Sequence, residues 1–375
     1  MFSMDDHRHM ARALRLAQRG RYTVVPNPVV GCLLVRDGAV VGEGWHLRAG
    51  EGHAEVNALN MAGERARGCT AYVTLEPCCH QGRTPPCSAA LIAAGVARVV
   101  VAMQDPNPQV AGQGLQQLQR AGIAVSCGLL QQQAEALNPG FISRMRRQRP
   151  FVRCKLAMSL DGRTAMADGS SRWITGAAAR RDVHLLRARS DAVVTGIDTV
   201  LADDPQMTVR DVAVDVFAAP LRVVLDSRLR IAADAHILNG AAPTLIVTSA
   251  QALEKQRDRC CELEQSGVAV ELVRLAADGS ERIDLNHLLT LLAERGINDL
   301  LIESGPTLSG AMMQQGLIDE LVVYMAAHLM GSDARSLFQL PGMDAMEQRI
   351  QLEFKEVRMV GDDVRMTLRP VGASG

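Results

Sequence analysis

The stretches Gly52-His53-Ala54-Glu55 and Glu76-Pro77-Cys78 place a histidine, acidic side chains and a cysteine at the ends of predicted elements. We predict that a helix covers residues 53–66 and that a strand ends just before Glu76. Cys87 then follows at the start of another predicted helix. Both cysteines lie near predicted helix starts, where the helix dipole favours a thiolate. The alternation of strands and helices around these residues favours a three-layer α/β fold.

The same alternation extends in both directions along the chain. In the first half we predict a helix over residues 4–19 and another over 88–94, with strands at 29–35, 40–41, 71–75 and 99–102. Residues 144–150 (RMRRQRP) interrupt this pattern, and we interpret them as a solvated linker, with a phosphate-binding arm as the alternative. The rhythm then restarts, with strands predicted at 151–156, 192–195, 222–225, 245–247, 300–302 and 321–324. We therefore expect two α/β domains, at residues 1–147 and 148–375.

Composition excludes several classes of protein. Of 375 residues, 47% are hydrophobic and 22% charged, which is typical of a folded globular chain. Forty basic and 41 acidic residues give a net charge of -1, so no overall positive field favours nucleic acid. No apolar run approaches the roughly 20 residues that cross a bilayer. The N-terminus lacks a signal peptide, and the nine cysteines suit a reducing compartment, so we expect a cytoplasmic protein without membrane partners.

One imidazole and two thiolates, from His53, Cys78 and Cys87, form a typical catalytic zinc set with an open fourth position. Glu55 lies two residues after the histidine, where it can exchange protons without binding the metal. Zinc deaminases use such a glutamate while a metal-activated water attacks the ring carbon that carries the amine. The alternative is a closed structural site in which Cys79 or His80 supplies a fourth ligand. We interpret the six remaining cysteines as small buried hydrophobes.

The spacing of the cysteines departs from the usual deaminase pattern P-C-x-x-C, because position 81 is Gln81 and the second thiolate is Cys87. Several longer motifs nevertheless resemble one family, the bifunctional deaminase–reductases of riboflavin biosynthesis. In the first half these are 26–32 (PNPVVGC), 52–55 (GHAE), 74–78 (TLEPC) and 82–87 (GRTPPC). In the second half they are 155–162 (KLAMSLDG), 200–205 (VLADDP) and 303–308 (ESGPTL). Cys79 is a departure, since the family usually has serine there.

The resemblance implies a cytidine-deaminase-like N-terminal domain in which His53, Cys78 and Cys87 bind Zn²⁺. Glu55 would be the catalytic proton shuttle in that domain. The substrate would be contacted by Asn27 and by His46, although a surface histidine without a role is an equal interpretation of His46.

The second half has no G-x-G-x-x-G after a predicted strand and no Walker lysine. One feature suits a phosphate: the strand at 300–303 leads into Gly305-Pro306-Thr307-Leu308-Ser309-Gly310. Glycine allows close backbone approach, proline suits a first helical turn, and the N–H groups of a helix start attract anions. An ordinary strand-to-helix turn is the alternative interpretation.

The resemblance implies that this half is a dihydrofolate-reductase-like domain using NADPH. It assigns the cofactor to Ala157, Trp173, Thr199, Asp203, Ser227, Gly305, Pro306, Thr307, Leu308, Ser309, Gly310 and Ala311. It assigns the substrate to Ser171, Arg187, Met207, Arg210 and Glu303. Guanidinium groups suit a 5′-phosphate, so Arg187 and Arg210 fit that role, unless they are solvated surface arginines. Lys155, one of three lysines in the chain, also lies in a predicted apolar strand.

The implied function has two steps. Hydrolysis would deaminate 2,5-diamino-6-ribosylamino-4(3H)-pyrimidinone 5′-phosphate, and NADPH would then reduce the ribosyl chain to give 5-amino-6-ribitylamino-uracil 5′-phosphate. We expect a homo-oligomer that acts on this small pyrimidine ribosylamine phosphate and on no nucleic acid. The alternatives are a nucleic-acid deaminase with an appended binding domain and a zinc-structured binding module.

Overall fold

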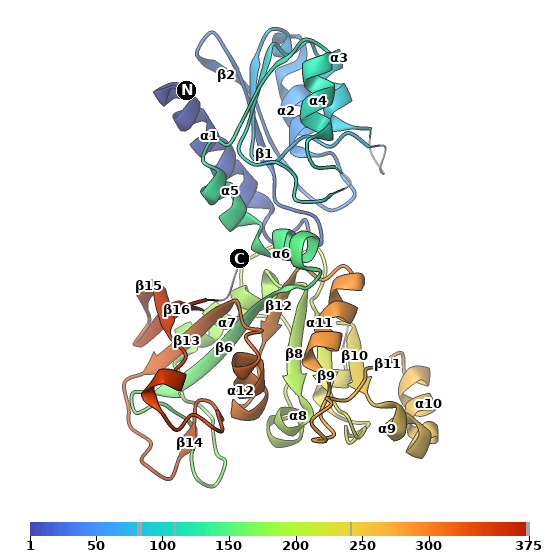
Figure 1. Ribbon diagram of the computed structural model, residues 1–375, viewed down its shortest axis with the longest axis vertical. Coiled ribbons are helices and arrows are strands. Elements are labelled where there is room, and N and C mark those ends of the chain that lie inside the picture. Colours follow the sequence, from blue (N-terminus) through green and yellow to red (C-terminus); the bar gives the residue numbers. More distant parts are fainter. Residues whose placement is uncertain (81–84, 109, 241, 373–375) are drawn as a thin grey trace. The chain divides into compact units, whose positions relative to one another are not determined.

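The computed structural model describes residues 1–80, 85–108, 110–240 and 242–372, so the motif residues 81–84 lie outside the described residues. The chain divides into two compact units, each with its own sheet (Figure 1). Unit 1 comprises Met1–Gln148 and Val214–Ala218, and unit 2 comprises Arg149–Ala213 and Ala219–Gly375.

Unit 1 contains a five-stranded sheet in the order β2-β1-β3-β4-β5. Strand β1 is antiparallel to β2 and β3, whereas β3, β4 and β5 are parallel. The strands are β1 (Gly31–Arg36), β2 (Ala39–Trp45), β3 (Thr70–Val73), β4 (Arg98–Val101) and β5 (Ala124–Cys127). The helices are α1 (Met4–Ala17), α2 (Ala54–Ala62), α3 (Cys87–Ala93), α4 (Gln113–Arg120), α5 (Gln131–Leu137) and α6 (Pro139–Arg147).

The helices of unit 1 cover both faces of the sheet, which confirms the predicted three layers. Apolar residues of α2, α3 and α4 pack on one face, and those of α1 and α5 pack on the other (Figure 1). Close packing of α2 depends on Gly44 of β2, because a Cβ there would lie 2.2 Å from the carbonyl oxygen of Ala54. The sheet therefore holds tightly the helix start that carries His53 and Glu55.

The prediction of a linker at residues 144–150 is wrong. Residues 144–147 form the last turn of α6, and Gln148 ends that helix in a left-handed conformation with φ of 53°. Three arginines in this turn face the negative end of the helix dipole, where cations stabilise a helix. The basic run is therefore a helix end, and the chain enters the first strand of unit 2 directly after Pro150.

Unit 2 contains a nine-stranded sheet in the order β11-β10-β9-β8-β12-β6-β13-β16-β15, which is parallel from β11 to β13. Its strands are β6 (Phe151–Ser159), β8 (Ala192–Gly196), β9 (Leu221–Leu225), β10 (Thr244–Thr248), β11 (Ala269–Leu272), β12 (Asp299–Ile302), β13 (Glu320–Ala326), β15 (Leu352–Val360) and β16 (Asp363–Pro370). A separate pair is formed by β7 (Arg163–Ala165) and β14 (Arg335–Ser336). All six strands predicted in this half are confirmed.

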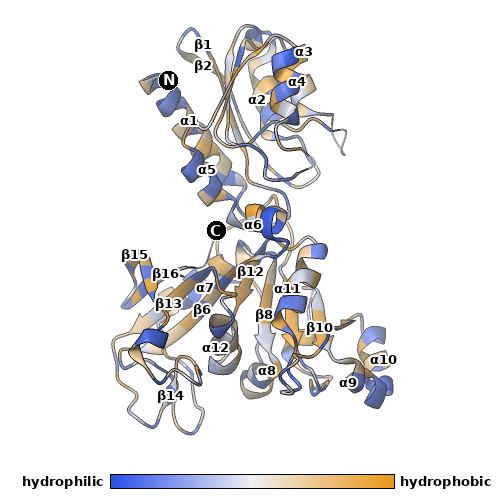
Figure 2. Cartoon of the chain, viewed as in Figure 1, coloured by the Kyte–Doolittle hydropathy of each residue, from blue (hydrophilic) through white to orange (hydrophobic). Residues whose placement is uncertain are grey.

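The helices of unit 2 are α7 (Ala177–Ala188), α8 (Ile197–Asp203), α9 (Ala250–Lys255), α10 (Arg257–Gln265), α11 (Leu285–Glu294) and α12 (Pro306–Gln314). Two apolar clusters lie on the opposite faces of the sheet. Figure 2 shows the matching pattern, with hydrophobic colour along β6 and β12 and hydrophilic colour on α9 and α10. No helix in the described part of the chain is long and apolar enough to cross a membrane.

Two candidate active sites

The predicted metal ligands of unit 1 meet at one point. His53 is the N-cap of α2, Cys87 is the first residue of α3, and Cys78 lies in the loop after β3. The Nδ1 atom of His53 lies 3.3 Å from Sγ of Cys87 and 3.6 Å from Sγ of Cys78. All three ligand atoms lie within 4.8 Å of one another.

This geometry fits zinc. Tetrahedral bonds of ~2.1 Å to nitrogen and ~2.3 Å to sulfur place those two atoms about 3.6 Å apart. The Cys78 sulfur also accepts a hydrogen bond from the Cys87 backbone N–H at 3.3 Å. The hydrogen bond with the Cys87 thiol lowers the pKa of Cys78, which favours a thiolate there. Among the described residues the ligand group has three members, so neither Cys79 nor His80 completes a closed site.

Glu55 lies in the first turn of α2 with 3% of its surface exposed. Burial raises the pKa of its carboxyl to about 7, and the carboxyl forms a hydrogen bond with the Cys87 thiol. A buried carboxyl beside the ligand group, but outside it, can hold and release a proton.

The two predicted substrate contacts of unit 1 lie together beside the ligands. Asn27 Nδ2 lies 3.1 Å from Nε2 of His46, and Nδ1 of His46 lies 3.2 Å from the carbonyl oxygen of Gly52. A proton on Nδ1 satisfies both contacts, because Nε2 can then accept from Asn27. The His46 ring meets the His53 ring edge to face at 5.2 Å. His46 is only 2% exposed, so it is not a surface histidine.

Unit 2 has a large cleft of about 1540 Å³ at the carboxyl ends of β6, β12, β8 and β9. Ligands of open α/β sheets bind at this edge. The volume exceeds the ~300–1,000 Å³ of an ordinary small-molecule pocket. The cleft therefore has room for a cofactor and a substrate at the same time. The predicted residues that line it are Ala157, Ser171, Trp173, Arg187, Thr199, Asp203, Met207, Arg210, Ser227, Glu303, Gly305, Pro306, Thr307, Leu308 and Ala311.

Ser309 and Gly310 do not line the cleft, in contrast to their neighbours in the predicted loop. Ser309 is fully buried, and its hydroxyl contacts Cys154 and Ser304. A Cβ on Gly310 would lie 2.0 Å from the carbonyl oxygen of Gln339. Both residues face the protein interior because the turn of α12 directs them away from the cleft.

Glu303 is the most strongly paired acid of the cleft. Arg187 donates two hydrogen bonds to it, from Nε at 2.5 Å and from Nη2 at 2.9 Å. Lys155 Nζ lies 3.9 Å from the same carboxylate. Burial opposes ionisation of Glu303, but the charge of Arg187 outweighs it and lowers the pKa of the carboxyl. The guanidinium fork of Arg187 is therefore engaged by Glu303, and the interpretation of Arg187 as a phosphate fork is not supported.

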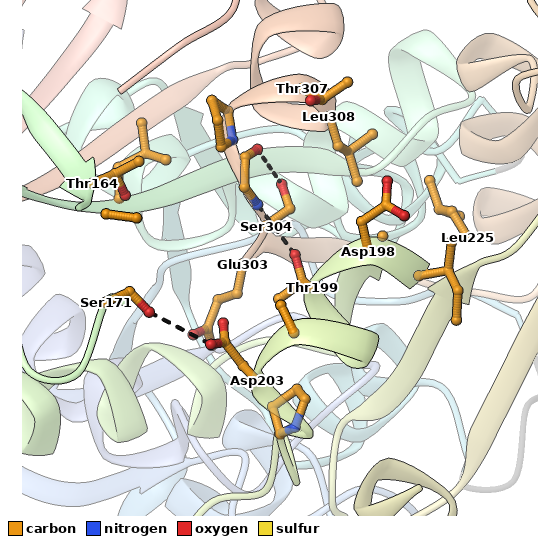
Figure 3. A pocket seen from close by; sticks show the side chains of 18 of the residues that line it. Thr164, Ser171, Asp198, Thr199, Asp203, Leu225, Glu303, Ser304, Thr307 and Leu308 are labelled. Carbon is orange, nitrogen blue, oxygen red and sulfur yellow. Dashed lines mark hydrogen bonds between the residues drawn. The ribbon is translucent and has the colours of Figure 1, made fainter. Parts of the chain in front are cut away.

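Figure 3 shows other polar side chains of the cleft, with Ser171 and Asp203 beside Glu303 and with Thr199 beside Ser304. Thr199 accepts a hydrogen bond from the backbone N–H of Gly305 at 3.3 Å, and Ser171 contacts Asp203 at 3.5 Å. Arg210 is exposed, and its Nη1 donates to the neighbouring side chains of Gln206 and Thr208. Its guanidinium therefore remains accessible to a ligand.

Comparison with known proteins gives matches over both units. Residues 3–103 match the model of the cytidine and deoxycytidylate deaminase zinc-binding region, and residues 150–366 match the RibD C-terminal domain. The riboflavin biosynthesis protein RibD of Escherichia coli is 52% identical over 99% of this chain and 100% of its own length. The RibD of Haemophilus influenzae is 46% identical over 99% of both chains.

The chain belongs to the RibD family. Solved structures agree: RibD of Acinetobacter baumannii has a TM-score of 0.90 with 46% identity, covering 98% of this chain and 99% of that one. A structure from Thermotoga maritima, described as a diaminohydroxyphosphoribosylaminopyrimidine deaminase/5-amino-6-(5-phosphoribosylamino)uracil reductase, has a TM-score of 0.83 with 31% identity, covering 98% and 99%. RibD is the bifunctional enzyme of riboflavin biosynthesis, a zinc-dependent deaminase and an NADPH-dependent reductase.

The cleft of unit 2 fits NADPH. Gly305 is the N-cap of α12 and Pro306 is its first residue, so the free N–H groups of that turn face the cleft, where a pyrophosphate suits them. Arg180 stacks over the ring of Trp173 at 4.5 Å and holds this exposed aromatic at the cleft wall.

Sequence reasoning missed other residues of both sites. Buried Glu76 accepts hydrogen bonds from the backbone N–H groups of Asp105, Gly112, Gly114 and Leu115 and so joins the loop after β3 to the start of α4. Glu76 belongs to the motif at residues 74–78, but its hydrogen-bond partners lie 29 to 39 residues further along the chain, so the motif does not indicate them. Lys155 is unusual as a lysine in a predicted apolar strand, but the sequence around it indicates no role. Arg228, Arg230 and Arg282, which also line the cleft, had no signal in the sequence.

Proposed function

We propose that His53, Cys78 and Cys87 hold the zinc of the deaminase. When bound there, zinc would supply the Lewis acidity that activates water against the amine-bearing ring carbon. The observation that carries this assignment is the convergence of three ligand atoms within 4.8 Å beside a buried carboxyl that is not one of them.

Glu55 is the proton carrier of this site. A carboxyl with a pKa of about 7 can accept a proton and return it near neutral pH, and departure of ammonia requires such a transfer. Asn27 and His46 orient the pyrimidine, since their polar side chains lie together next to His53.

The cleft of unit 2 holds NADPH and the deaminated substrate side by side, with NADPH as the source of hydride. The start of α12 takes the pyrophosphate of the cofactor, and Arg210 takes the 5′-phosphate of the substrate. Glu303 accepts hydrogen bonds from the ribosyl hydroxyls, while Arg187 keeps that carboxylate ionised and fixed in direction. Support for these roles comes from the lining of the cleft and from the pairing of Glu303.

Product analysis by mass spectrometry tests both assignments. The purified chain is incubated with the diaminopyrimidine ribosylamine phosphate in the presence and in the absence of NADPH. We expect only the deaminated ribosyl compound without NADPH and the ribityl compound with it. Failure to release ammonia in either reaction would refute the assignment of the zinc site.

The chain also acts as a homo-oligomer in the cytoplasm. Edge strand β15 exposes Phe354, Val357 and Met359 by 60%, 59% and 61%, and apolar side chains exposed on an edge strand suit pairing with a second copy. Val357→Lys should lower the mass measured by light scattering, and an unchanged mass would refute this interface. Nine free cysteines support a reducing compartment, which cell fractionation can test.

A further inference from the structure

Three arginines line the cleft of unit 2 at the end away from Glu303, and none has a role so far. Arg228 directly follows Ser227 after β9, and Arg230 lies two residues further on. Arg282 comes from the segment that precedes α11 and directly precedes Ile283, which also lines the cleft. These arginines are the cations available to an anionic group at this end.

The order of the strands fixes the direction in which a dinucleotide lies. Successive neighbours β6, β12, β8 and β9 end along the cleft, with Lys155 on the first, Glu303 after the second and Ser227 after the last. Strands are spaced ~4.8 Å apart, so β9 ends about 10 Å from β12. Figure 3 shows this axis, with Ser171 near Glu303 on one side and Leu225 with Asp198 on the other.

A cofactor whose pyrophosphate meets the start of α12 therefore extends in two directions. Its nicotinamide turns toward Glu303, where the substrate lies, and its adenosine turns toward β9. Apolar side chains line the cleft at that end, from Leu225, Ile283, Leu285 and Leu308, and they suit the faces of an adenine ring. A phosphate on the adjoining ribose must then lie at the polar rim of this slot.

We propose that Arg228 and Arg282 bind the 2′-phosphate of NADPH and so distinguish it from NADH; this inference rests on the proposed binding of NADPH in the cleft. Arg282 is exposed and interacts with the charge of Asp278, and among the described residues its side chain donates no hydrogen bond, so its guanidinium can bind a phosphate. Guanidinium groups match phosphate oxygens in a bidentate fashion.

Arg228 is ion-paired with Glu281, which competes only weakly with a phosphate for the guanidinium. Its Nη2 lies 2.8 Å from Oε2 of Glu281, and the two side chains are 66% and 54% exposed. Exposed ion pairs contribute little free energy, so a phosphate dianion can displace the carboxylate from Arg228. A 2′-hydroxyl carries no charge and cannot do so. Arg230 differs in that it is less exposed, at 44%, and its Nη2 lies 2.6 Å from Oδ1 of Asp198 in α8, a shorter contact than the one between Arg228 and Glu281.

The test measures dissociation constants of the full-length protein for NADPH and NADH by cofactor fluorescence, and for adenosine 2′,5′-bisphosphate by calorimetry. We expect Arg228→Ala and Arg282→Ala each to raise the dissociation constants of NADPH and of the bisphosphate by about 10- to 100-fold, because each variant loses a hydrogen bond to a charged group. Binding of NADH should be nearly unchanged. Glu281→Gln should tighten binding of the bisphosphate, because it removes the competing carboxylate.

Arg274→Ala is the matched control, since Arg274 is 68% exposed and ion-paired with Asp284 but does not line the cleft. It should leave all three constants unchanged. The proposal is overturned if Arg228→Ala weakens the binding of NADPH and of NADH equally, or if Arg230→Ala alone changes the binding of the bisphosphate. If the wild-type chain binds neither cofactor, the assignment of the cleft itself fails.

Discussion

Arg187 holds both carboxylate oxygens of Glu303, although the two residues lie 116 positions apart in the chain. The pair is almost fully buried, with side-chain exposures of 12% and 7%. A buried ion pair of this geometry fixes the direction of the carboxylate, and the removal of one partner leaves an uncompensated charge. In the function that we propose, Arg187 therefore acts on the reaction through Glu303.

Arg187→Lys should impair reduction and leave deamination unchanged. Lysine keeps the charge but cannot make the bidentate contact, so Glu303 loses its fixed orientation. We expect kcat for reduction to fall about 10- to 100-fold, with a smaller change in KM. Rates of NADPH oxidation and of ammonia release measure the two activities. A variant that reduces its substrate normally would show that the pairing has only a structural role.

Arg210→Ala should weaken binding of the substrate and leave binding of the cofactor unchanged. Its exposed guanidinium is the one we assign to the 5′-phosphate, and loss of a charged hydrogen bond there removes about 1.5–3 kcal/mol. KM for the ribosylamine phosphate should rise accordingly, while the dissociation constant of NADPH measured by fluorescence stays constant. The opposite result, weaker binding of NADPH with an unchanged KM for the substrate, would exclude this role of Arg210.

The adjacent thiols should behave differently. Cys78→Ser should lower zinc content and stop ammonia release, because Cys78 is in the ligand group. Cys79→Ser should do neither, since the Cys79 thiol contacts Gln113 at 4.0 Å instead. Zinc is measured by atomic absorption after dialysis. Loss of zinc in the Cys79 variant alone would reverse the choice of ligand.

Asp6 should make the stability of unit 1 depend on pH. Burial opposes its ionisation, but hydrogen bonds from Arg98, Ser3 and Tyr72 outweigh burial and lower its pKa. A depressed pKa in the folded state adds stability above the unfolded value of ~3.9, and this stability is lost as the pH falls below that value. Asp6→Asn should cost about 2–3 kcal/mol at pH 7 and progressively less below pH ~4. Thermal unfolding of both proteins at several pH values measures this difference, and a constant difference would contradict it.

Local motifs made much of the fold and the zinc site predictable. His53 and Cys87 lie at helix starts and Cys78 lies in the loop after β3, so the layering of the sheet brings the three residues together. The charge and the proline of residues 144–150 suggest a linker, but the helix dipole stabilises the same charges at a helix end, and this is where the structure has them.

Pairings between distant segments were not predictable. Nothing near Arg187 indicates that Glu303 takes its guanidinium, and the sequence gives equal weight to every residue from Gly305 to Ala311. The helical turn of α12 decides that Ser309 and Gly310 face inward while Thr307 and Leu308 line the cleft. Such choices depend on packing rather than on local pattern.

The central claim is that one chain carries two independent active sites, and the variant Glu55→Gln tests it most directly. The purified variant is assayed for bound zinc, for ammonia released from the diaminopyrimidine substrate, and for NADPH oxidation with the already deaminated ribosylamine phosphate. We predict full zinc content, deamination lowered about 10²- to 10⁴-fold and normal reduction. Normal deamination, loss of zinc, or loss of reduction along with deamination would contradict the account.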